Sequence, residues 1–411
     1  MTSPRKVVLA YSGGLDTSVI IPWLKEHYGS RVIAVIVDVG QPEDFPAVRQ
    51  KALASGADGA EIVDAKDEFV SEYCFPALRA NAVYEGQYLL GTALARPVIA
   101  KAQVEVALAE EADAVAHGCT GKGNDQVRFE LAYKALAPHL RIIAPWREWT
   151  LQSRDNEIEY AAAHGIPVPA TREKPYSVDQ NIWHRSAEAG ILEDPWREPP
   201  EHVYGVTVAP EQAPDDPAYV EIGFERGTPT AVDGRPMSAV DILTSLNRLG
   251  AAHGVGRADM VENRLVGIKS RGVYETPGGT ILATAHRDLE TITLDRETQH
   301  YGMLIAPRYA ELVYYGQWFT PLRQAFDGFV TSAQAAVTGT VRLRLFKGTC
   351  VSVGRRSPNS LYREDLATFG ADGVYNQKDA EGFINLWALP GQVFAATNPG
   401  LMRRGMREPV K

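Results

Sequence analysis

Cysteine is scarce in this chain of 411 residues, and its three cysteines, Cys74, Cys119 and Cys350, lie far apart and form no Cys-x-x-Cys pair. This pattern excludes a disulfide framework and a cysteine zinc site, and it favours a reducing compartment, the cytoplasm. Long apolar runs are absent as well. No stretch approaches the roughly eighteen apolar residues that a membrane span needs, so we expect no such span.

The chain also lacks an excess of positive charge. Its 42 Lys and Arg residues are outnumbered by 51 Asp and Glu residues, and the formal net charge is −9. We therefore do not expect a surface that binds nucleic acid by neutralising phosphates. Residues 1–6 run directly into an apolar strand pattern, which leaves no room for a secretory signal peptide. These absences narrow the class of protein but identify no reaction.

Strand and helix patterns alternate along the first part of the chain. Apolar runs predict strands at residues 7–10, 32–39, 61–63, 114–116 and 142–144. Helical spacing predicts helices at residues 45–56, 97–110, 126–137 and 153–164, the last of them ending at Gly165. This alternation predicts an α/β fold with a doubly wound parallel sheet, whose ligands bind at the carboxyl ends of the strands.

The composition changes near residues 166–169. Beyond that point the strand patterns alternate apolar and polar residues, as at 219–224 and in a hairpin of 340–346 with 350–353, which predicts an antiparallel sheet. An amphipathic helix is expected at 236–252. We predict a nucleotide-binding domain (1–170), an α+β domain (171–365) and a tail (366–411). The tail carries an apolar patch, Phe383–Trp387, that we expect to pack on a neighbouring subunit.

The segment Ala10–Ser18 joins the first predicted strand to a helix and reads Ala-Tyr-Ser-Gly-Gly-Leu-Asp-Thr-Ser. A Gly- and Ser-rich turn before a helix N-terminus directs backbone N–H groups toward an anion, so this segment predicts a phosphate site. It lacks the lysine and spacing of a Walker loop and the three spaced glycines of the dinucleotide fingerprint. The alternative is an ordinary turn in which Asp16 or Thr17 caps the helix.

A second polar cluster, His117–Phe129, also lies where a predicted strand leads into a helix. It offers Lys122 as a mobile cation, Asn124 and Asp125 as polar groups, and Arg128 one helical turn beyond Asn124. These groups suit a zwitterionic amino acid, whose carboxylate would bind Arg or backbone N–H groups and whose ammonium would bind Asp. The alternative is a Gly-rich turn followed by a helix with ordinary surface charges.

Two further segments stand out. In Tyr84–Pro97 the tyrosines and Leu89-Leu90 have the character of core residues. Glu262–Arg264 and Lys269–Gly278 are too charged for a core and too rich in glycine for a helix. We expect a solvated loop there, although convergent charge also suits a polar substrate.

In this order, the four segments resemble the argininosuccinate synthase family, citrulline–aspartate ligases of the N-type ATP pyrophosphatase (PP-loop) superfamily. The resemblance extends from residue 6 to about residue 365 and rests on AYSGGLDTS, YLLGT-x-LARP, HG-x-TGKGNDQVRFE and ENR…KSRG-x-YETP. It implies a first domain like the adenine nucleotide alpha hydrolases, a homotetramer, and a role in arginine biosynthesis. In this family ATP activates L-citrulline as a citrullyl-adenylate, pyrophosphate leaves, and the amino group of L-aspartate displaces AMP. Mg²⁺ is expected on the ATP phosphates.

The resemblance also implies site residues, none of them a direct metal ligand. ATP would bind Ala10, Tyr11, Ser12, Gly13, Gly14, Leu15, Asp16, Thr17 and Ser18, with Val37 and Gly118 near the adenine and ribose. Citrulline would bind Tyr88, Asn124, Arg128, Ser177, Ser186, Glu262 and Tyr274. Aspartate would bind Thr120, Asn124 and Asp125. The catalytic residues would be Asp16, Lys122 and Asp125.

One position departs from the family pattern. Some relatives have a serine that helps to hold citrulline where this chain has Ala93, so Ala93 is left out of the predicted site. Cys119 is interpreted as a small packing residue. No residue is an obvious general base, and the proton acceptor for the aspartate amine would be the AMP phosphate or Asp125.

Two other functions could use the first loop. A tRNA-thiolating enzyme would need catalytic cysteine pairs and a basic face, which the sequence lacks. A non-catalytic nucleotide sensor would leave the cluster of Asn124, Asp125 and Arg128 without a purpose.

Overall fold

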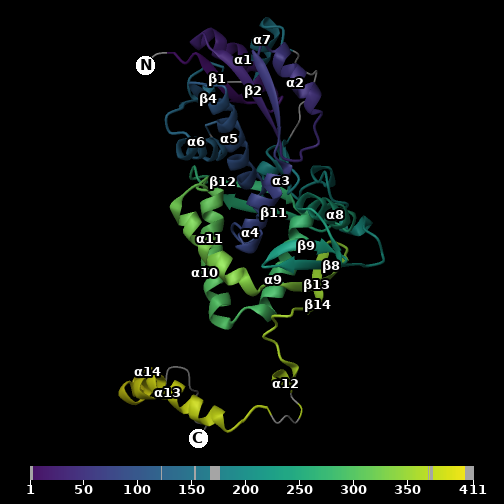
Figure 1. Cartoon of the computed structure of the whole chain (residues 1–411), viewed down its shortest axis with the longest axis vertical. Coiled ribbons are helices and arrows are strands. Elements are labelled where there is room, and N and C mark those ends of the chain that lie inside the picture. Colours follow the sequence, from purple (N-terminus) through teal and green to yellow (C-terminus); the bar gives the residue numbers. More distant parts are fainter. Residues whose placement is uncertain are drawn as a thin grey trace. The chain divides into compact units, whose positions relative to one another are not determined.

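A computed structural model describes residues 3–121, 123–151, 154–166, 176–368, 370 and 374–402. The chain divides into two compact units, Met1–Asn359 and Ser360–Lys411 (Figure 1). The larger unit contains both the parallel sheet and the antiparallel sheets that the sequence predicts. The boundaries of the three predicted domains stay a prediction.

A five-stranded parallel sheet with the strand order β3-β2-β1-β4-β5 confirms the predicted fold class. Successive side chains of a strand point to opposite faces, so Val7 and Leu9 pack in one core cluster whereas Val8 packs in another. Both faces are covered by helices, as a doubly wound sheet requires. The strands are β1 (Lys6–Ala10), β2 (Arg31–Asp38), β3 (Gly59–Asp64), β4 (Ala114–Ala116) and β5 (Arg141–Ile143). The helices are α1 (Leu15–Tyr28), α2 (Phe45–Ala54) and α7 (Arg154–Ala163) on one face, and α5 (Gly91–Ala109) and α6 (Asp125–Leu136) on the other.

Two predicted helix starts are wrong. Helix α5 begins at Gly91 rather than Pro97, after Leu90 in the left-handed region with φ of 65°, and Pro97 therefore lies inside the helix. Proline lacks the N–H that would close a helical hydrogen bond, so this helix tolerates one missing bond. Helix α8 (Ala239–Ala252) begins after Ser238, whose side chain accepts a hydrogen bond from the N–H of Asp241.

The second half of the larger unit contains two antiparallel sheets. One has the order β10-β9-β8-β13-β14 and the other β11-β12-β7-β6. The first comprises β8 (Ala218–Glu225), β9 (Thr228–Val232), β10 (Arg235–Pro236), β13 (Gly339–Phe346) and β14 (Thr349–Arg356). The second comprises β6 (Ser177–Gln180), β7 (Arg185–Glu188), β11 (Arg257–Asn263) and β12 (Lys269–Glu275). The predicted hairpin at Lys347-Gly348 is confirmed, and both of these residues have positive φ, as a tight hairpin turn needs.

The solvated loop expected at Glu262–Arg264 and Lys269–Gly278 is wrong. Strands β11 and β12 pair over their whole length there, and helix α9 (Pro277–Thr293) begins at Pro277. Charged residues are accommodated in this sheet because they find partners. Arg271, for example, donates two hydrogen bonds to the carboxylate of Asp259. Tertiary contacts thus overrule the polar composition of the segment.

The remaining elements of the larger unit are helices and short turns. They are α3 (Lys66–Glu68), the π-helix η1 (Phe69–Cys74), α4 (Phe75–Arg79), α10 (Arg296–Tyr314) and α11 (Pro321–Ala333), together with the 3₁₀ turns η2 (Pro145–Arg147), η3 (Gly190–Glu193), η4 (Glu201–Val203), η5 (Pro210–Gln212) and η6 (Gln334–Ala336).

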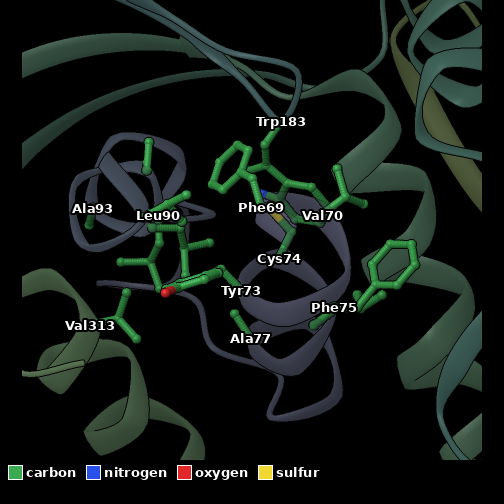
Figure 2. Packing of buried hydrophobic residues seen from close by; sticks show 14 of the residues in the cluster. Phe69, Val70, Tyr73, Cys74, Phe75, Ala77, Leu90, Ala93, Trp183 and Val313 are labelled. Carbon is green, nitrogen blue, oxygen red and sulfur yellow. The ribbon is translucent and has the colours of Figure 1, made fainter. Parts of the chain in front are cut away.

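One continuous hydrophobic core joins the parallel sheet to the second half of the larger unit. Figure 2 shows how its side chains gather around the π-helix, with Leu90 at the start of α5, Ala93 on α5, Trp183 from the loop between β6 and β7, and Val313 from α10. Trp183 also donates from its indole nitrogen to the carbonyl of Leu89 at 2.8 Å. The antiparallel part is therefore held on the parallel sheet by shared packing.

A buried glutamine ties together the two central strands of the parallel sheet. The Nε2 of Gln103, on α5, donates to the carbonyls of Val8 on β1 and Ala116 on β4 at 2.8 and 2.9 Å. The hydroxyl of Tyr133 donates to its Oε1. This network fixes the spacing of β1 and β4 just below the loops that follow them.

The smaller unit contains the helices α12 (Glu364–Ala367), α13 (Asp379–Thr397) and α14 (Pro399–Met402). The predicted patch Phe383–Trp387 lies on α13, where Phe383 and Trp387 stack with 5.6 Å between ring centroids and are 62% and 75% exposed. In the part of the chain that the structure describes, no helix is both long and apolar enough to cross a membrane.

Candidate active site

A cavity of about 480 Å³ opens where the strand order of the parallel sheet reverses. From β1 the chain moves outward to β2 and β3, and later returns to β4 on the other side of β1. A crevice at such a switch point is the usual ligand site of an open α/β sheet. The loops that follow β1 and β4 both contribute to the cavity, as the sequence predicts.

The loop after β1 leads into helix α1 without a side-chain cap. Gly14 is the N-cap residue, and no described side chain accepts a hydrogen bond from the first turn. The alternative that Asp16 or Thr17 caps this helix is therefore wrong. Ser12 and Asp16 line the cavity beside the uncapped helix end, where free N–H groups and the helix dipole favour an anion.

Contacts within this loop hold its shape. Gly13 has φ of 74°, and a Cβ there would lie 3.1 Å from Val48. The Nζ of Lys51, on α2, donates to the Gly13 carbonyl at 2.7 Å. The Ser18 hydroxyl donates to the Gly14 carbonyl at 2.7 Å and lies 2.9 Å from the Tyr11 hydroxyl. Several residues that were predicted to bind ATP thus stabilise the conformation of the loop from outside the cavity.

The loop after β4 approaches helix α1 at Gly118. A Cβ at Gly118 would lie 3.0 Å from the Cγ2 of Thr17, so a larger residue there would displace Thr17 by a few tenths of an ångström. Gly118 and Thr120 line the cavity, whereas Val37 is buried near the end of β2. Lys122 lies outside the described residues, so its predicted role stays a prediction.

Asn124 and Arg128 lie on the cavity face of α6, as the spacing of one helical turn predicts. Both are buried, with 7% and 4% of their surface exposed. The Nε of Arg128 donates to the Tyr314 carbonyl and its Nη1 to Asp125, each at 2.9 Å. Two of the three guanidinium nitrogens are therefore already engaged, and Nη2 is left to face a ligand.

Asp125 belongs to a chain of partly buried charges, in which the side chains of Arg96, Asp125 and Asp179 are 15%, 28% and 32% exposed. Its Oδ2 accepts from the Nε of Arg96 at 2.9 Å, and the Nη2 of Arg96 lies 3.1 Å from Asp179. Asp179 also accepts from the Thr92 hydroxyl at 2.6 Å. Burial alone would raise the pKa of Asp125, but Arg96 and Arg128 lower it below its ordinary value. Asp125 is therefore a stable carboxylate and a weak base.

The opposite wall of the cavity comes from the second half of the chain. Ser186 and Tyr274 are paired across β7 and β12, and the Tyr274 ring lies 4.5 Å from that of Tyr88. Glu262, on β11, is 4% exposed. Burial raises the pKa of Glu262 above its ordinary value, while the neighbouring Tyr314, Arg128 and Tyr274 oppose the rise.

All of the residues predicted to bind the two amino acids line this one cavity. They are Tyr88, Thr120, Asn124, Asp125, Arg128, Ser177, Ser186, Glu262 and Tyr274. Ala93 is not among the lining residues and is buried in the core of Figure 2. In the described part of the chain, no group of three or more His, Cys, Asp or Glu residues could hold a metal ion.

Two family models together match nearly the whole chain. One, described as the arginosuccinate synthase N-terminal HUP domain, matches residues 6–167, and the other, the C-terminal domain, matches residues 176–394. The chain belongs to the argininosuccinate synthase family.

Proteins named argininosuccinate synthase match over almost their full length. Those of Moorella thermoacetica and Carboxydothermus hydrogenoformans are each 62% identical over 96% of this chain, and the match covers 97% and 98% of their own lengths. That of Roseiflexus sp. is 59% identical over 95% of this chain and covers 96% of its own length. Identity at this level over nearly the whole chain shows that the family assignment applies to both parts of the protein.

The cavity of this argininosuccinate synthase family member includes six polar residues that were not predicted as site residues: Thr92, Arg96, Asp179, Glu188, Arg264 and Tyr314. Thr92, Arg96 and Arg264 lie inside segments that carry the resemblance. Their polar side chains in these segments could therefore have indicated that they belong to the site. Asp179 follows Ser177 on β6. Glu188 pairs with Arg264. Tyr314 has no sequence signal, because a tyrosine in an amphipathic helix is typical of core packing.

The Arg96→Met variant tests the chain of partly buried charges. It removes the partner that Asp125 and Asp179 share. Because these carboxylates are partly exposed and solvent screens them, we expect urea unfolding at pH 7 to show a loss of free energy of unfolding of about 2 kcal/mol, between the values for exposed and buried pairs. The pKa of Asp179, like that of Asp125, is lowered in the folded protein. A carboxylate whose pKa is lowered by folding stabilises the fold at pH values above its pKa in the unfolded chain, about 3.9. This stabilisation is lost as the pH falls through the pKa that the group has in the folded protein.

Without Arg96, burial raises the pKa of Asp179 and protonation relieves the unpaired charge. The difference in free energy of unfolding between Arg96→Met and the parent should therefore be smaller at about pH 4 than at pH 7. The control is Arg308→Met, which removes an exposed ion pair with Glu311 and should change stability by less than about 1 kcal/mol at either pH. Equal effects of the two variants would contradict the chain of partly buried charges.

Proposed function

We propose that this chain condenses L-citrulline with L-aspartate at the expense of ATP, through a citrullyl-adenylate, and releases AMP and pyrophosphate. The observation that carries the proposal is that one cavity combines an uncapped helix N-terminus with the buried polar side chains of Asn124, Arg128 and Glu262 and the partly buried carboxylate of Asp125. The membership of the argininosuccinate synthase family supports the same reaction, which serves arginine biosynthesis.

In this proposal ATP lies with its phosphates at the uncapped end of α1. The backbone of Ser12–Leu15 and the hydroxyl of Ser12 would hold the leaving pyrophosphate, and Gly118 leaves room for the nucleotide between the two loops. Mg²⁺ takes oxygen ligands and is commonly held by one or two carboxylates plus substrate phosphates. Asp16, on the cavity wall, is the carboxylate that fits this arrangement, and the ion would neutralise charge on the leaving group.

The two amino acids would share the rest of the cavity. Citrulline would lie between Arg128 and the wall of Ser186, Glu262 and Tyr274, and aspartate would lie near Thr120 and Asp125. Asn124 has both a donor and an acceptor, so it suits the point where the substrates meet. The low pKa of Asp125 favours a role in holding the aspartate ammonium, and the AMP phosphate is then the better proton acceptor.

A tRNA-thiolating function is less well supported. Cys119 lines the cavity, but burial raises the pKa of its thiol, and a protonated thiol is a poor nucleophile. Cys74 is fully buried in the core, where its pKa is raised as well.

We also propose a homotetramer in the cytoplasm. The exposed apolar side chains on α13, including Phe383, Leu386 and Trp387, suit burial against another subunit. The three free cysteines suit a reducing compartment. A monomer in light scattering, or the enzyme in an oxidising compartment after fractionation, would contradict these two proposals.

The reaction can be tested with the purified chain. ATP, Mg²⁺, citrulline and aspartate together should give stoichiometric pyrophosphate, AMP and argininosuccinate, and omission of aspartate should stop the release of argininosuccinate. A sensor would bind ATP without turnover and without affinity for citrulline in calorimetry. Absence of pyrophosphate release with all four components would refute the synthase proposal.

The Arg128→Lys variant tests the citrulline site. Lysine is a point charge and cannot hold the Tyr314 carbonyl, Asp125 and a substrate carboxylate at the same time. We expect the KM for citrulline to rise at least tenfold, measured by steady-state pyrophosphate release, while the KM for ATP changes less than threefold. The Arg147→Lys variant is a control, because Arg147 is half exposed and pairs with Glu130 away from the cavity. An unchanged KM for citrulline would remove Arg128 from the site.

A further inference from the structure

Tyr314 is the last residue of α10 and reaches the cavity from far along the chain. It is fully buried, with 0% of its surface exposed. Its ring stacks on that of Tyr84 with 3.7 Å between centroids and an angle of 7° between planes. Tyr314 is therefore held rigidly before any substrate arrives.

The hydroxyl of Tyr314 fixes the side-chain amide of Asn124. The backbone N–H of Leu265 donates to one side-chain atom of Asn124 at 3.0 Å, and since an N–H can only donate, that atom is Oδ1. The other atom is then Nδ2, which donates to the Tyr314 hydroxyl at 2.9 Å. The amide has one remaining N–H and one remaining lone pair for ligands in the cavity.

The same tyrosine holds Arg128 through two other groups. Its backbone carbonyl accepts from the Nε of Arg128 at 2.9 Å, and the guanidinium carbon lies 4.8 Å from the centre of its ring. A cation over an aromatic face is attracted by the ring quadrupole. Together with Asp125 on Nη1, these contacts direct the free Nη2 of Arg128 toward the cavity.

Glu262 lines the same cavity as Tyr314. Burial raises the pKa of Glu262, and the neighbouring Tyr314 opposes this rise. The Oε2 of Glu262 is buried and accepts no hydrogen bond from the described residues. One oxygen of Glu262 is thus ready for a ligand.

We propose that Tyr314 is a positioning residue for both amino-acid substrates, which orients Asn124 and Arg128 in the free enzyme. The inference rests on the proposed condensation of citrulline with aspartate. It adds a residue that acts through others, since its hydroxyl accepts a hydrogen bond from Asn124 and its carbonyl accepts one from Arg128. Preorganised donors and acceptors need no reordering when substrates bind, so losing one should weaken catalysis as well as binding.

The Tyr314→Phe variant removes the hydroxyl and keeps the ring and the backbone carbonyl. We expect kcat/KM for citrulline and for aspartate each to fall at least tenfold, with the KM for ATP within threefold of the parent. The matched control is Tyr309→Phe, on the same helix. Tyr309 is equally buried, and its hydroxyl donates a hydrogen bond to Asp327 at 2.9 Å, outside the cavity. This variant should therefore keep kcat/KM for citrulline and for aspartate within twofold of the parent.

The pH profile separates positioning from a general loss of stability. The charged and titratable groups that face Glu262 are Arg128 from α6, Arg264, Tyr274 from β12, Glu188 from β7, Tyr84, Tyr88 and Tyr314. Without the Tyr314 hydroxyl, a group that opposes the effect of burial is lost and the pKa of Glu262 rises further. The acid limb of kcat/KM for citrulline should therefore move to higher pH in Tyr314→Phe and stay in place in Tyr309→Phe.

The outcomes are distinct. A parent enzyme without activity refutes the proposed function itself. An active parent with Tyr314→Phe equal to Tyr309→Phe in kcat/KM and in pH profile overturns the role of Tyr314. If Tyr314→Phe does not fold, 3-fluorotyrosine introduced at position 314 keeps ring and hydroxyl, and its ¹⁹F resonance should shift when citrulline is added. No shift at saturating citrulline would overturn the proposal.

Discussion

The parallel pairing of β1 with β4 is the constraint on which the site depends. It brings the loop after β1 and the loop after β4 to the same edge of the sheet, although more than a hundred residues separate them along the chain. Gln103 ties the two strands together beneath the loops. Because a parallel pair requires a long crossover connection, the intervening helices are also available to supply side chains such as Arg96.

Around this crevice the chemistry is set by partly buried charges in contact with one another. Asp179, Arg96, Asp125 and Arg128 form a continuous series, and Tyr314 joins Arg128 to Asn124. Although Asp125 and Arg128 pair within α6, Arg96 comes from α5, Asp179 from β6 and Tyr314 from α10, so the site forms only when these elements are in place. Such a network is costly to break at a single point.

Much of this could be predicted from the sequence, because the signals are local. The buried strands, the glycine turn before α1 and the cluster at Thr120–Arg128 all lie within short windows, and the resemblance of four segments pointed to residues that line one cavity. The failures have physical causes. Charged residues in β11 and β12 indicated a loop because their partners are distant in sequence, and Pro97 suggested a helix start because the core contacts that extend α5 back to Gly91 are tertiary.

The sequence by itself determined the parallel α/β class, the glycine turn before α1 and the residue types that line the cavity, since backbone propensity, glycine conformational freedom and side-chain chemistry belong to the residues themselves. Only the tertiary structure decided how these groups are oriented. The lowered pKa of Asp125, the fixed amide of Asn124 and the role of Tyr314 depend on contacts between elements far apart in the chain. Electrostatic and hydrogen-bond energies vary steeply with distance and burial, and these two quantities exist only after folding.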